Sequence, residues 1–241
     1  MPLPIVATPT YELKLPSSNK KIKYRPFLVK EEKVLIIALE SKRQSEITNA
    51  VKDVLKQCIL TKGVDVDSLP TFDIEYIFLN IRGKSVGESI DLIITCPDDG
   101  KTKVETKVYI DEIKVKIDDK HSPDIKLDNS LTLRMRYPAI DEFVKNNFDF
   151  KSENEETIEQ SFELIASCID IVYSQDESWA ASDCTKKELN DWLGSLDSRQ
   201  FKEIELFFQT MPKLSHTIKV TYPETKVESE VTLEGISNFF E

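Results

Sequence analysis

The segment Cys96-Pro97-Asp98-Asp99-Gly100 is the part of this sequence that comes closest to a metal-binding motif. Zinc ribbons use Cys-Pro-x-Cys-Gly knuckles, and here Asp99 stands where the second cysteine would be. A similar turn at Tyr222-Pro223 contains no cysteine. Because structural zinc needs about four nitrogen or sulfur ligands, the two turns cannot supply a site. The segment is either a turn that happens to contain Cys-Pro or a degenerate ribbon, and both alternatives predict no bound zinc.

Two other patterns suggest chemistry but have the wrong spacing. The string from Arg82 to Ser85 ends like a phosphate-binding loop, but that motif needs a second glycine at the position occupied by Phe78. The two histidines, His121 and His216, do not stand at metal-ligand spacing from cysteines or carboxylates, and we expect both on the surface. The sequence therefore predicts no catalytic, cofactor-binding or metal-binding residue, and a protein that is not an enzyme.

The overall composition narrows the class of partner. The 241 residues include 40% hydrophobic and 31% charged residues, as in ordinary globular proteins. A formal net charge of −11 argues against nucleic-acid binding, which relies on lysine and arginine to neutralise phosphates. No apolar run is long enough to span a membrane, and the N-terminus lacks the basic and apolar regions of a secretory signal. The four cysteines have no paired spacing, which favours a reducing compartment.

Short strands and helices would have to position these residues. The prolines of the first ten residues predict an extended arm. Residues 30–40 predict a largely buried helix because so many of them are apolar, and a buried strand fits the run nearly as well. Periodicity, capping and turn patterns predict helices at about 45–63, 71–83, 139–148, 157–173, 185–194 and 198–211, hairpins or strands at 11–24, 90–115, 125–136 and 218–236, and a loop at 176–183.

One pattern occurs twice in the chain. Helical runs at 72–81 and 201–211 are each followed by an apolar strand, Thr-[Cys/Tyr]-Pro, a turn, and Val-Glu-x-x-Val-x-[Ile/Leu]-[Asp/Glu]-x-Ile. This repetition predicts a duplicated helix-plus-hairpin module, with chance similarity between short alternating strands as the alternative. We therefore expect an α+β fold of short helices with β-hairpins. Its expected domains are 1–137, with the arm, first hairpins and helices, and 138–241, with a helical segment and the second hairpin module.

Two segments, at 69–89 and 94–100, resemble a known phage family. They read Leu-Pro-Thr-Phe-Asp-Ile-Glu-Tyr-Ile-Phe-Leu-Asn-Ile-Arg-Gly-Lys-Ser-Val-Gly-Glu-Ser and Ile-Thr-Cys-Pro-Asp-Asp-Gly. Both resemble the baseplate hub and hub-assembly proteins of T-even-type contractile-tailed phages. The opening Met-Pro-Leu-Pro and residues 20–32 are similar to the cyanophage-like branch. The resemblance covers residues 1–115 well and the remainder more loosely, and it brings no catalytic residue with it.

The resemblance implies a structural or assembly protein of the tail baseplate hub, located in the virion or in the host cytoplasm during assembly. Its partners would be other baseplate or tail proteins, not nucleic acid or membrane, and whether it is oligomeric stays open. A tail-assembly chaperone absent from the virion is the main alternative, and an uncharacterised enzyme is another. Trp179, with acidic neighbours, is either an interface anchor or is packed against its own helices. The predicted partner-binding residues are Pro2, Pro4, Cys96, Pro97, Trp179, Tyr222 and Pro223.

Overall fold

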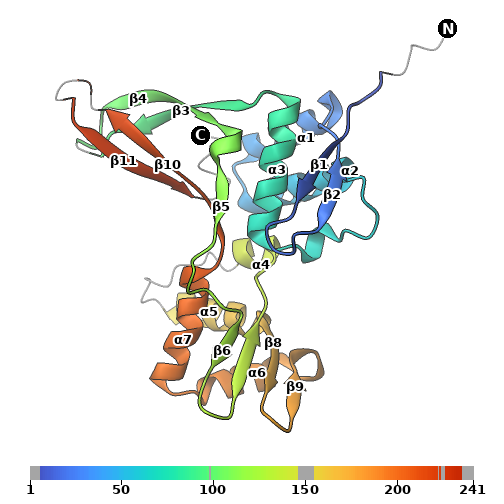
Figure 1. Ribbon diagram of the computed structural model, residues 1–241, viewed down its shortest axis with the longest axis vertical. Helices are drawn as coiled ribbons and strands as arrows, with labels where there is room; N and C mark the ends of the chain where they lie inside the picture. The colour runs from blue at the N-terminus through green and yellow to red at the C-terminus, as the bar shows by residue number, and fades with distance from the viewer. Residues whose placement is uncertain (1–5, 98, 146–154, 222, 224–225, 235–241) are drawn as a thin grey trace. The chain divides into compact units, whose positions relative to one another are not determined.

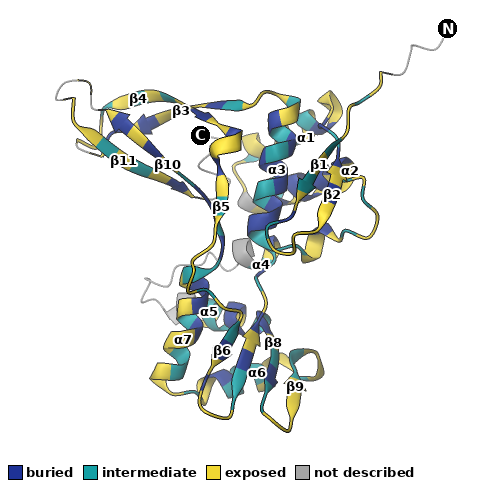
Figure 2. Ribbon diagram, in the orientation of Figure 1, coloured by how far each residue is buried: buried dark blue, intermediate teal, exposed yellow. Residues whose placement is uncertain are grey.

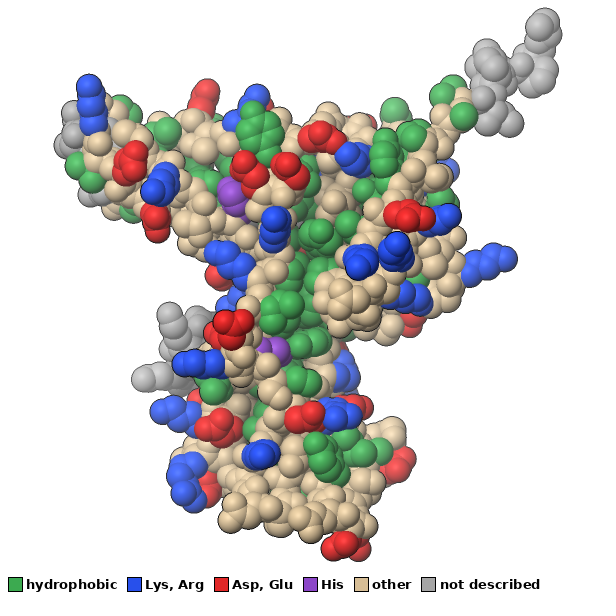
Figure 3. Space-filling view, in the orientation of Figure 1, with side chains coloured by type: hydrophobic (Ala, Val, Ile, Leu, Met, Phe, Trp, Pro, Cys, Tyr) green, Lys and Arg blue, Asp and Glu red, His purple; other side chains and the backbone are tan. Residues whose placement is uncertain are grey.

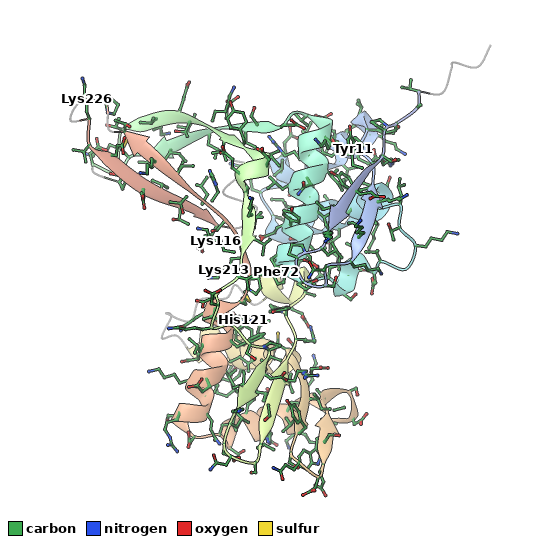
Figure 4. All side chains as sticks on the ribbon, in the orientation of Figure 1. Tyr11, Phe72, Lys116, His121, Lys213 and Lys226 are labelled. Carbon is green, nitrogen blue, oxygen red and sulfur yellow. The ribbon has the colours of Figure 1, made fainter. Side chains whose placement is uncertain are left out.

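A computed structural model describes residues 6–97, 99–145, 155–221, 223 and 226–234 of the chain (Figure 1). The chain forms two compact units, unit 1 (Met1–Lys116 and Lys213–Glu241) and unit 2 (Ile117–Pro212). Lys116 and Lys213 are paired neighbours in one sheet, so unit 2 is an insertion between two adjacent strands of unit 1 (Figure 4). This division differs from the expected boundary after residue 137. The reason is that β10 (Lys213–Thr221) pairs with β5 (Lys114–Lys116) and returns the C-terminal hairpin to the N-terminal unit.

The first part of unit 1 combines a short hairpin with three helices. Strands β1 (Tyr11–Lys14) and β2 (Lys21–Tyr24) pair antiparallel, as predicted. Helices α1 (Val29–Ser41), α2 (Gln44–Cys58) and α3 (Thr71–Ser85) follow, with a short 3-10 turn, η1 (Val66–Ser68), before α3. Most positions of α3 are buried or partly buried (Figure 2).

Helix α3 is tied to its surroundings at both ends. In its first turn the buried Asp73 accepts hydrogen bonds from the backbone N–H of Ser17 (3.0 Å) and from the Ser17 hydroxyl, in the turn between β1 and β2. Gly83 lies inside the helix and does not end it, contrary to the prediction. A Cβ atom at this position would lie 3.0 Å from Cδ1 of Ile110. The glycine therefore permits close packing and does not act as a helix stop.

Two hairpins form the rest of unit 1. Strand β3 (Ser89–Thr95) pairs with β4 (Lys103–Tyr109), and β10 pairs with β11 (Glu228–Glu234) and with β5. A 3-10 turn, η2 (Ile110–Glu112), separates β4 from β5 where one continuous strand was expected. Side chains alternate between buried and exposed along β3, and its buried face shares one core with those of β10 and β11. This core contains Leu79, Ile90, Leu92, Ile94, Cys96, Val108, Ile110, Ile113, Leu214, Ile218, Val220 and Leu233.

The repeated sequence pattern corresponds to the two hairpins and not to two equivalent modules. Helix α3 packs in unit 1 with the hairpins, whereas the helix before the second hairpin, α7 (Ser198–Thr210), belongs to unit 2. Thr95 pairs with Lys103, while the matching Thr221 pairs with Glu228, which corresponds in sequence to Glu105. The two registers thus differ by two residues. Because strand side chains alternate, a shift of two keeps the same positions facing the core.

Unit 2 packs helices against a four-stranded antiparallel sheet. The sheet order is β6-β7-β8-β9, built from β6 (Asp124–Lys126), β7 (Thr132–Met135), β8 (Ile169–Tyr173) and β9 (Ser178–Ala180). Its helices are α4 (Ile140–Lys145), α5 (Glu155–Ser167), α6 (Lys186–Gly194) and α7, with a 3-10 turn, η3 (Ala181–Asp183). The core contains Ile125, Leu127, Leu133, Met135, Leu164, Ile165, Ala166, Cys168, Ile169, Val172, Leu193, Ile204, Phe207 and Phe208.

Two predicted elements of unit 2 are wrong, although the α+β class is confirmed. The helix expected at 157–173 ends at Ser167, and residues 169–173 form strand β8 instead. The loop expected at 176–183 contains strand β9. The first error has a physical cause. Strand β8 is paired on both sides, with β7 and β9, and a short apolar run alone cannot distinguish such a strand from the last turns of a helix. The helix expected at 139–148 begins at Ile140, and residues 146–148 lie outside the described part of the chain.

Candidate functional site

An apolar pocket lies in unit 2 between the sheet and α6. Its volume is about 330 Å³, at the lower end of the range typical of ligand pockets. Trp179 forms part of the wall and has 47% of its surface exposed. The lining residues are Leu131, Ile169, Val172, Trp179, Ala181, Cys184, Leu189 and Trp192. Such a lining can accept an aliphatic or aromatic side chain, but it does not bring together an acid, a base and a nucleophile.

Local sequence signals position the two walls of this pocket. Trp179 in β9 is directly opposite Val172 in β8, so the two side chains lie on the same face of the sheet. On the other wall, Thr185 and Glu188 form a reciprocal capping box that starts α6. The Thr185 hydroxyl accepts from the Glu188 N–H at 3.3 Å, and the Glu188 carboxylate accepts from the Thr185 N–H at 2.7 Å. The hydrogen bonds that the carboxylate accepts from the Thr185 N–H and from the Thr185 hydroxyl hold the pKa of Glu188 below its ordinary value.

Acidic residues flank Trp179 in the chain. Asp176 and Glu177 precede β9, Asp183 follows it, and all three are exposed. The turn before β9 is held by Ser174, which accepts from the backbone N–H groups of Asp176 (3.3 Å) and Glu177 (3.1 Å). On the face shown in Figure 3, acidic and basic side chains are interspersed over both units with apolar side chains between them. Trp179 is therefore an aromatic side chain at the surface with carboxylates beside it in sequence.

A second candidate surface is helix α1 in unit 1. Six large apolar side chains between residues 28 and 39 are exposed, out of fifteen such side chains in the described part of the chain. The prediction that this helix is largely buried is wrong, because only Glu31 and Ala38 along it are fully buried. The exposed side chains are Leu28, Val29, Val34, Ile36, Ile37 and Leu39, with Val29 at 80%.

The other predicted partner-binding residues have different placements. Cys96 is 1% exposed and packs in the core between the hairpins, so its thiol is not part of the surface. Pro97 and Pro223 are exposed in the two hairpin turns, and Lys226 marks the second turn in Figure 4, where its φ is 59°. Pro2, Pro4 and Tyr222 lie outside the described residues.

The residues suspected of chemistry have structural roles. His121 was expected at the surface, but it stacks on Tyr137 and lies 5.0 Å from the Phe207 ring, with its ring nitrogens 2.9 Å from the Tyr137 hydroxyl and 3.0 Å from the Thr210 hydroxyl. His216 is also partly buried, and its Nε2 lies 3.8 Å from the Glu112 carboxylate. Among the described residues, no group of three or more histidine, cysteine and acidic side chains could hold a metal ion.

The remaining motif and the cysteines likewise belong to the framework. The string that ends like a phosphate-binding loop is helical, and the Ser85 hydroxyl within it accepts the Phe27 N–H at 2.9 Å and donates to the Ile81 carbonyl. Burial raises the pKa of Cys58 to about 11 and that of Cys168 to about 12, so both thiols stay protonated at neutral pH. In the described part of the chain, no helix is both long and apolar enough to cross a membrane.

Comparison with known families decides what kind of protein this is. A family described as "T4 bacteriophage base plate protein" matches residues 8–241, nearly the whole length of the chain. The chain belongs to this family. Neither the curated proteins nor the solved structures give a match. The base plate family therefore extends over both units, including the inserted unit 2.

Sequence reasoning predicts part of the candidate surface of this base plate protein. Trp179 was singled out because an aromatic residue with acidic neighbours is a common kind of interface anchor. Its partners across the pocket, Trp192 and Leu189, were predicted only as the inner face of a helix. The exposure of α1 was missed, although an unusually apolar run between lysine and glutamate residues was visible in the sequence.

Proposed function

We propose that this base plate protein is a structural or assembly subunit of the baseplate hub of a contractile phage tail, and that it acts through contacts with other baseplate or tail proteins. The observation that carries the proposal is the exposed apolar surface of α1. Six large apolar side chains are exposed along residues 28–39, and exposed apolar surface gathered in one place usually marks a site of protein or membrane interaction. The assignment to the hub rests on the resemblance of residues 69–89 and 94–100 to hub and hub-assembly proteins.

Other surfaces support a role in contacts. Strands β4 and β11 lie at the edges of their sheets, and each has one paired neighbour among the described residues. Such edges can accept an added strand from a partner. The pocket beside Trp179 can take a side chain from a partner, and its lining favours contact over bond-breaking chemistry. Together these features provide binding surfaces on both units.

Quantitative mass spectrometry of purified phage particles beside infected-cell lysate tests the proposal. A copy number at a fixed multiple of three or six relative to known tail proteins would support a subunit of the finished hub, because closed assemblies follow rotational symmetry. Presence in unfinished baseplates and lysate but not in particles would support the assembly-chaperone alternative. Absence from particles and from all tail intermediates would overturn both forms of the proposal.

A further inference from the structure

We propose that a different base plate protein docks an extended segment along β9 of unit 2 and places a large apolar side chain, flanked by lysine or arginine, against Trp179 and the pocket. This inference rests on the proposed function and names the partner chemistry of one surface. Three neighbouring features carry it. They are a free strand edge, an apolar pocket whose wall includes that strand, and an excess of carboxylates beside it.

Strand β9 is the last strand of its sheet. The order β6-β7-β8-β9 leaves it with one paired neighbour among the described residues, and its residues Ser178 and Trp179 are exposed. The strand is already formed, because it pairs with β8 and the turn between them is closed by a hydrogen bond from the Ser174 N–H to the Glu177 carbonyl (2.8 Å). An exposed edge of this kind offers backbone groups to an added strand.

The register decides which side of the sheet an added residue would face. Trp179 and Val172 are directly opposite each other, and both line the pocket. Because directly opposite residues lie on the same face of a sheet, a residue added opposite Trp179 would also lie on the pocket face. Its side chain would cover the indole, which is 47% exposed, and burial of apolar surface is favourable. This position therefore suits a large apolar side chain.

The pocket indicates which occupants fit. Its volume of about 330 Å³ is roughly twice that of an apolar cavity that binds benzene. The lining contains no charged, amide or hydroxyl side chain, so a charged group would lose its hydration without compensation. It also lacks the few placed polar groups that orient a free small molecule in an ordinary ligand site. A side chain that is held by its own backbone does not need them, which favours a peptide segment.

The charges beside β9 indicate what should flank that side chain. Asp176 and Glu177 precede the strand and Asp183 follows it, and all three are exposed. In the described part of the chain, no lysine or arginine forms an ion pair with these three carboxylates. Residues 169–188 include five acidic side chains and two basic ones, both at the start of α6. Lysine or arginine on either side of the inserted side chain would complement this excess of negative charge.

The same carboxylates argue against other occupants. Nucleic acid and an anionic lipid surface both carry negative charge and would be repelled. A second copy of this chain would bring another net charge of −11 to the contact. Membership of the base plate family favours a base plate protein as the partner.

Peptide binding to the purified full chain tests this chemistry. The probe is acetyl-Lys-Thr-Phe-Thr-Lys-amide. The readout is fluorine NMR of protein labelled with fluorinated tryptophan, because Trp179 and Trp192 are the two tryptophans of the chain and both line the pocket. We expect both signals to shift saturably. Replacing both lysines of the probe by glutamate, or its phenylalanine by serine, should weaken binding about tenfold or more. Equal binding of the three peptides, or no saturable shift with the first, would overturn the proposal.

Protein variants test where the probe binds. Ala181→Leu adds carbon atoms inside the pocket and should weaken binding about tenfold. Ser182→Leu, at the exposed next position outside the lining, is its matched control and should bind like the wild type. Thermal unfolding shows whether each variant is folded. Equal binding by Ala181→Leu and the wild type would place the probe elsewhere and overturn the proposal.

A second pair of variants tests the charges without changing the pocket. Asp176→Asn combined with Glu177→Gln should weaken binding of the lysine probe severalfold, and added salt should reduce the difference from the wild type. Glu163→Gln combined with Glu203→Gln removes the same charge at exposed positions of α5 and α7, and it should leave binding unchanged. Equal effects of the two double variants would contradict a local role of the carboxylates beside β9.

Photo-crosslinking in isolated baseplates and their intermediates separates this contact from the general function. The exposed Ser178 is replaced by benzoylphenylalanine in the phage gene. We expect mass spectrometry to find it joined to a different base plate protein, in a segment where a large apolar residue has lysine or arginine within about three residues. If the chain is present but links only to itself, to a second copy or to acidic segments, only the docking proposal fails. If the wild-type chain is absent from baseplates and intermediates, the proposed function fails and the docking proposal fails with it.

Discussion

Glu31 anchors helix α1, whose exposed apolar side chains carry the proposed function, and its removal should destabilise unit 1. The carboxylate is 1% exposed and is paired with Arg25, whose side chain is 16% exposed. Removing one partner of a buried ion pair costs about 3–5 kcal/mol, and losing an N-terminal helix cap costs about 0.5–2 kcal/mol. Because Arg25 still reaches water, we expect Glu31→Ala to lower the free energy of unfolding by about 3 kcal/mol. Glu31→Gln should lower it by about 1–2 kcal/mol, since the amide can still accept the Leu28 N–H.

Acid should erase the difference between the wild type and Glu31→Gln. Burial by itself raises the pKa of Glu31, but the hydrogen bonds from Arg25 and from the Leu28 N–H outweigh it and hold the pKa below the ordinary 4.5. The unfolded chain therefore binds the proton first as pH falls. The stabilisation that the ionised Glu31 carboxylate provides is fully present above pH 4.5. It is lost as pH falls through the lower pKa that Glu31 has in the folded state.

The assay is urea unfolding monitored by tryptophan fluorescence and by hydrogen exchange. Both tryptophans, Trp179 and Trp192, lie in unit 2, so their fluorescence follows unit 2, whereas hydrogen exchange of the α1 amides follows unit 1. With an m-value of about 1.5–2 kcal/mol per M, a loss of 3 kcal/mol lowers the midpoint of the unit 1 transition by about 1.5–2 M. Glu32→Gln, at the adjacent and less buried position, is the control and should change stability by less than about 0.5 kcal/mol. A Glu31→Ala midpoint equal to that of the wild type, or a wild-type advantage over Glu31→Gln that grows in acid, would refute the reasoning.

Three further predictions concern both units. Asp73→Ala should lower the free energy of unfolding by about 2–3 kcal/mol because Ser17 loses its buried acceptor. Asp73→Asn should stay within about 1 kcal/mol of the wild type, since burial raises the pKa of the Asp73 carboxyl and so penalises its charged form. Urea titrations at pH 7 compare the two variants. Burial lowers the pKa of His121 below 6.5, so unit 2 should lose stability as pH falls from 6.5 to that lower pKa and no further; tryptophan-monitored melts should show this step, and His121→Gln should lack it. Trp179→Ala, at a half-exposed position, should lower the free energy of unfolding by about 1 kcal/mol, whereas Leu193→Ala, at a buried position, should lower it by about 2–5 kcal/mol. Unfolding monitored by circular dichroism measures both values, and equal losses would show that Trp179 belongs to the core.

The sequence was sufficient where a structural feature depends on neighbouring residues. The starts of α6 and α7 were predicted because Thr185 and Asp197 supply cap acceptors a few residues from the N–H groups they bind. The hairpins were predicted because alternation and turn residues act within a short stretch of chain. The α+β class follows from these local elements. For the candidate site, the same local information located Trp179 and the helix opposite it.

Only the tertiary structure decided which local elements belong together and which faces are covered. The insertion of unit 2 depends on pairing between Lys116 and Lys213, which are far apart in sequence. Residues 169–173 became a strand because β7 and β9 pair with both of its edges, and this pairing outweighs a helical pattern that the same residues also fit. Burial of α1 could not be predicted for the same reason, since an apolar sequence indicates that a helix needs a cover but not which molecule supplies it. Backbone pairing and burial are long-range interactions, so periodicity alone does not determine them.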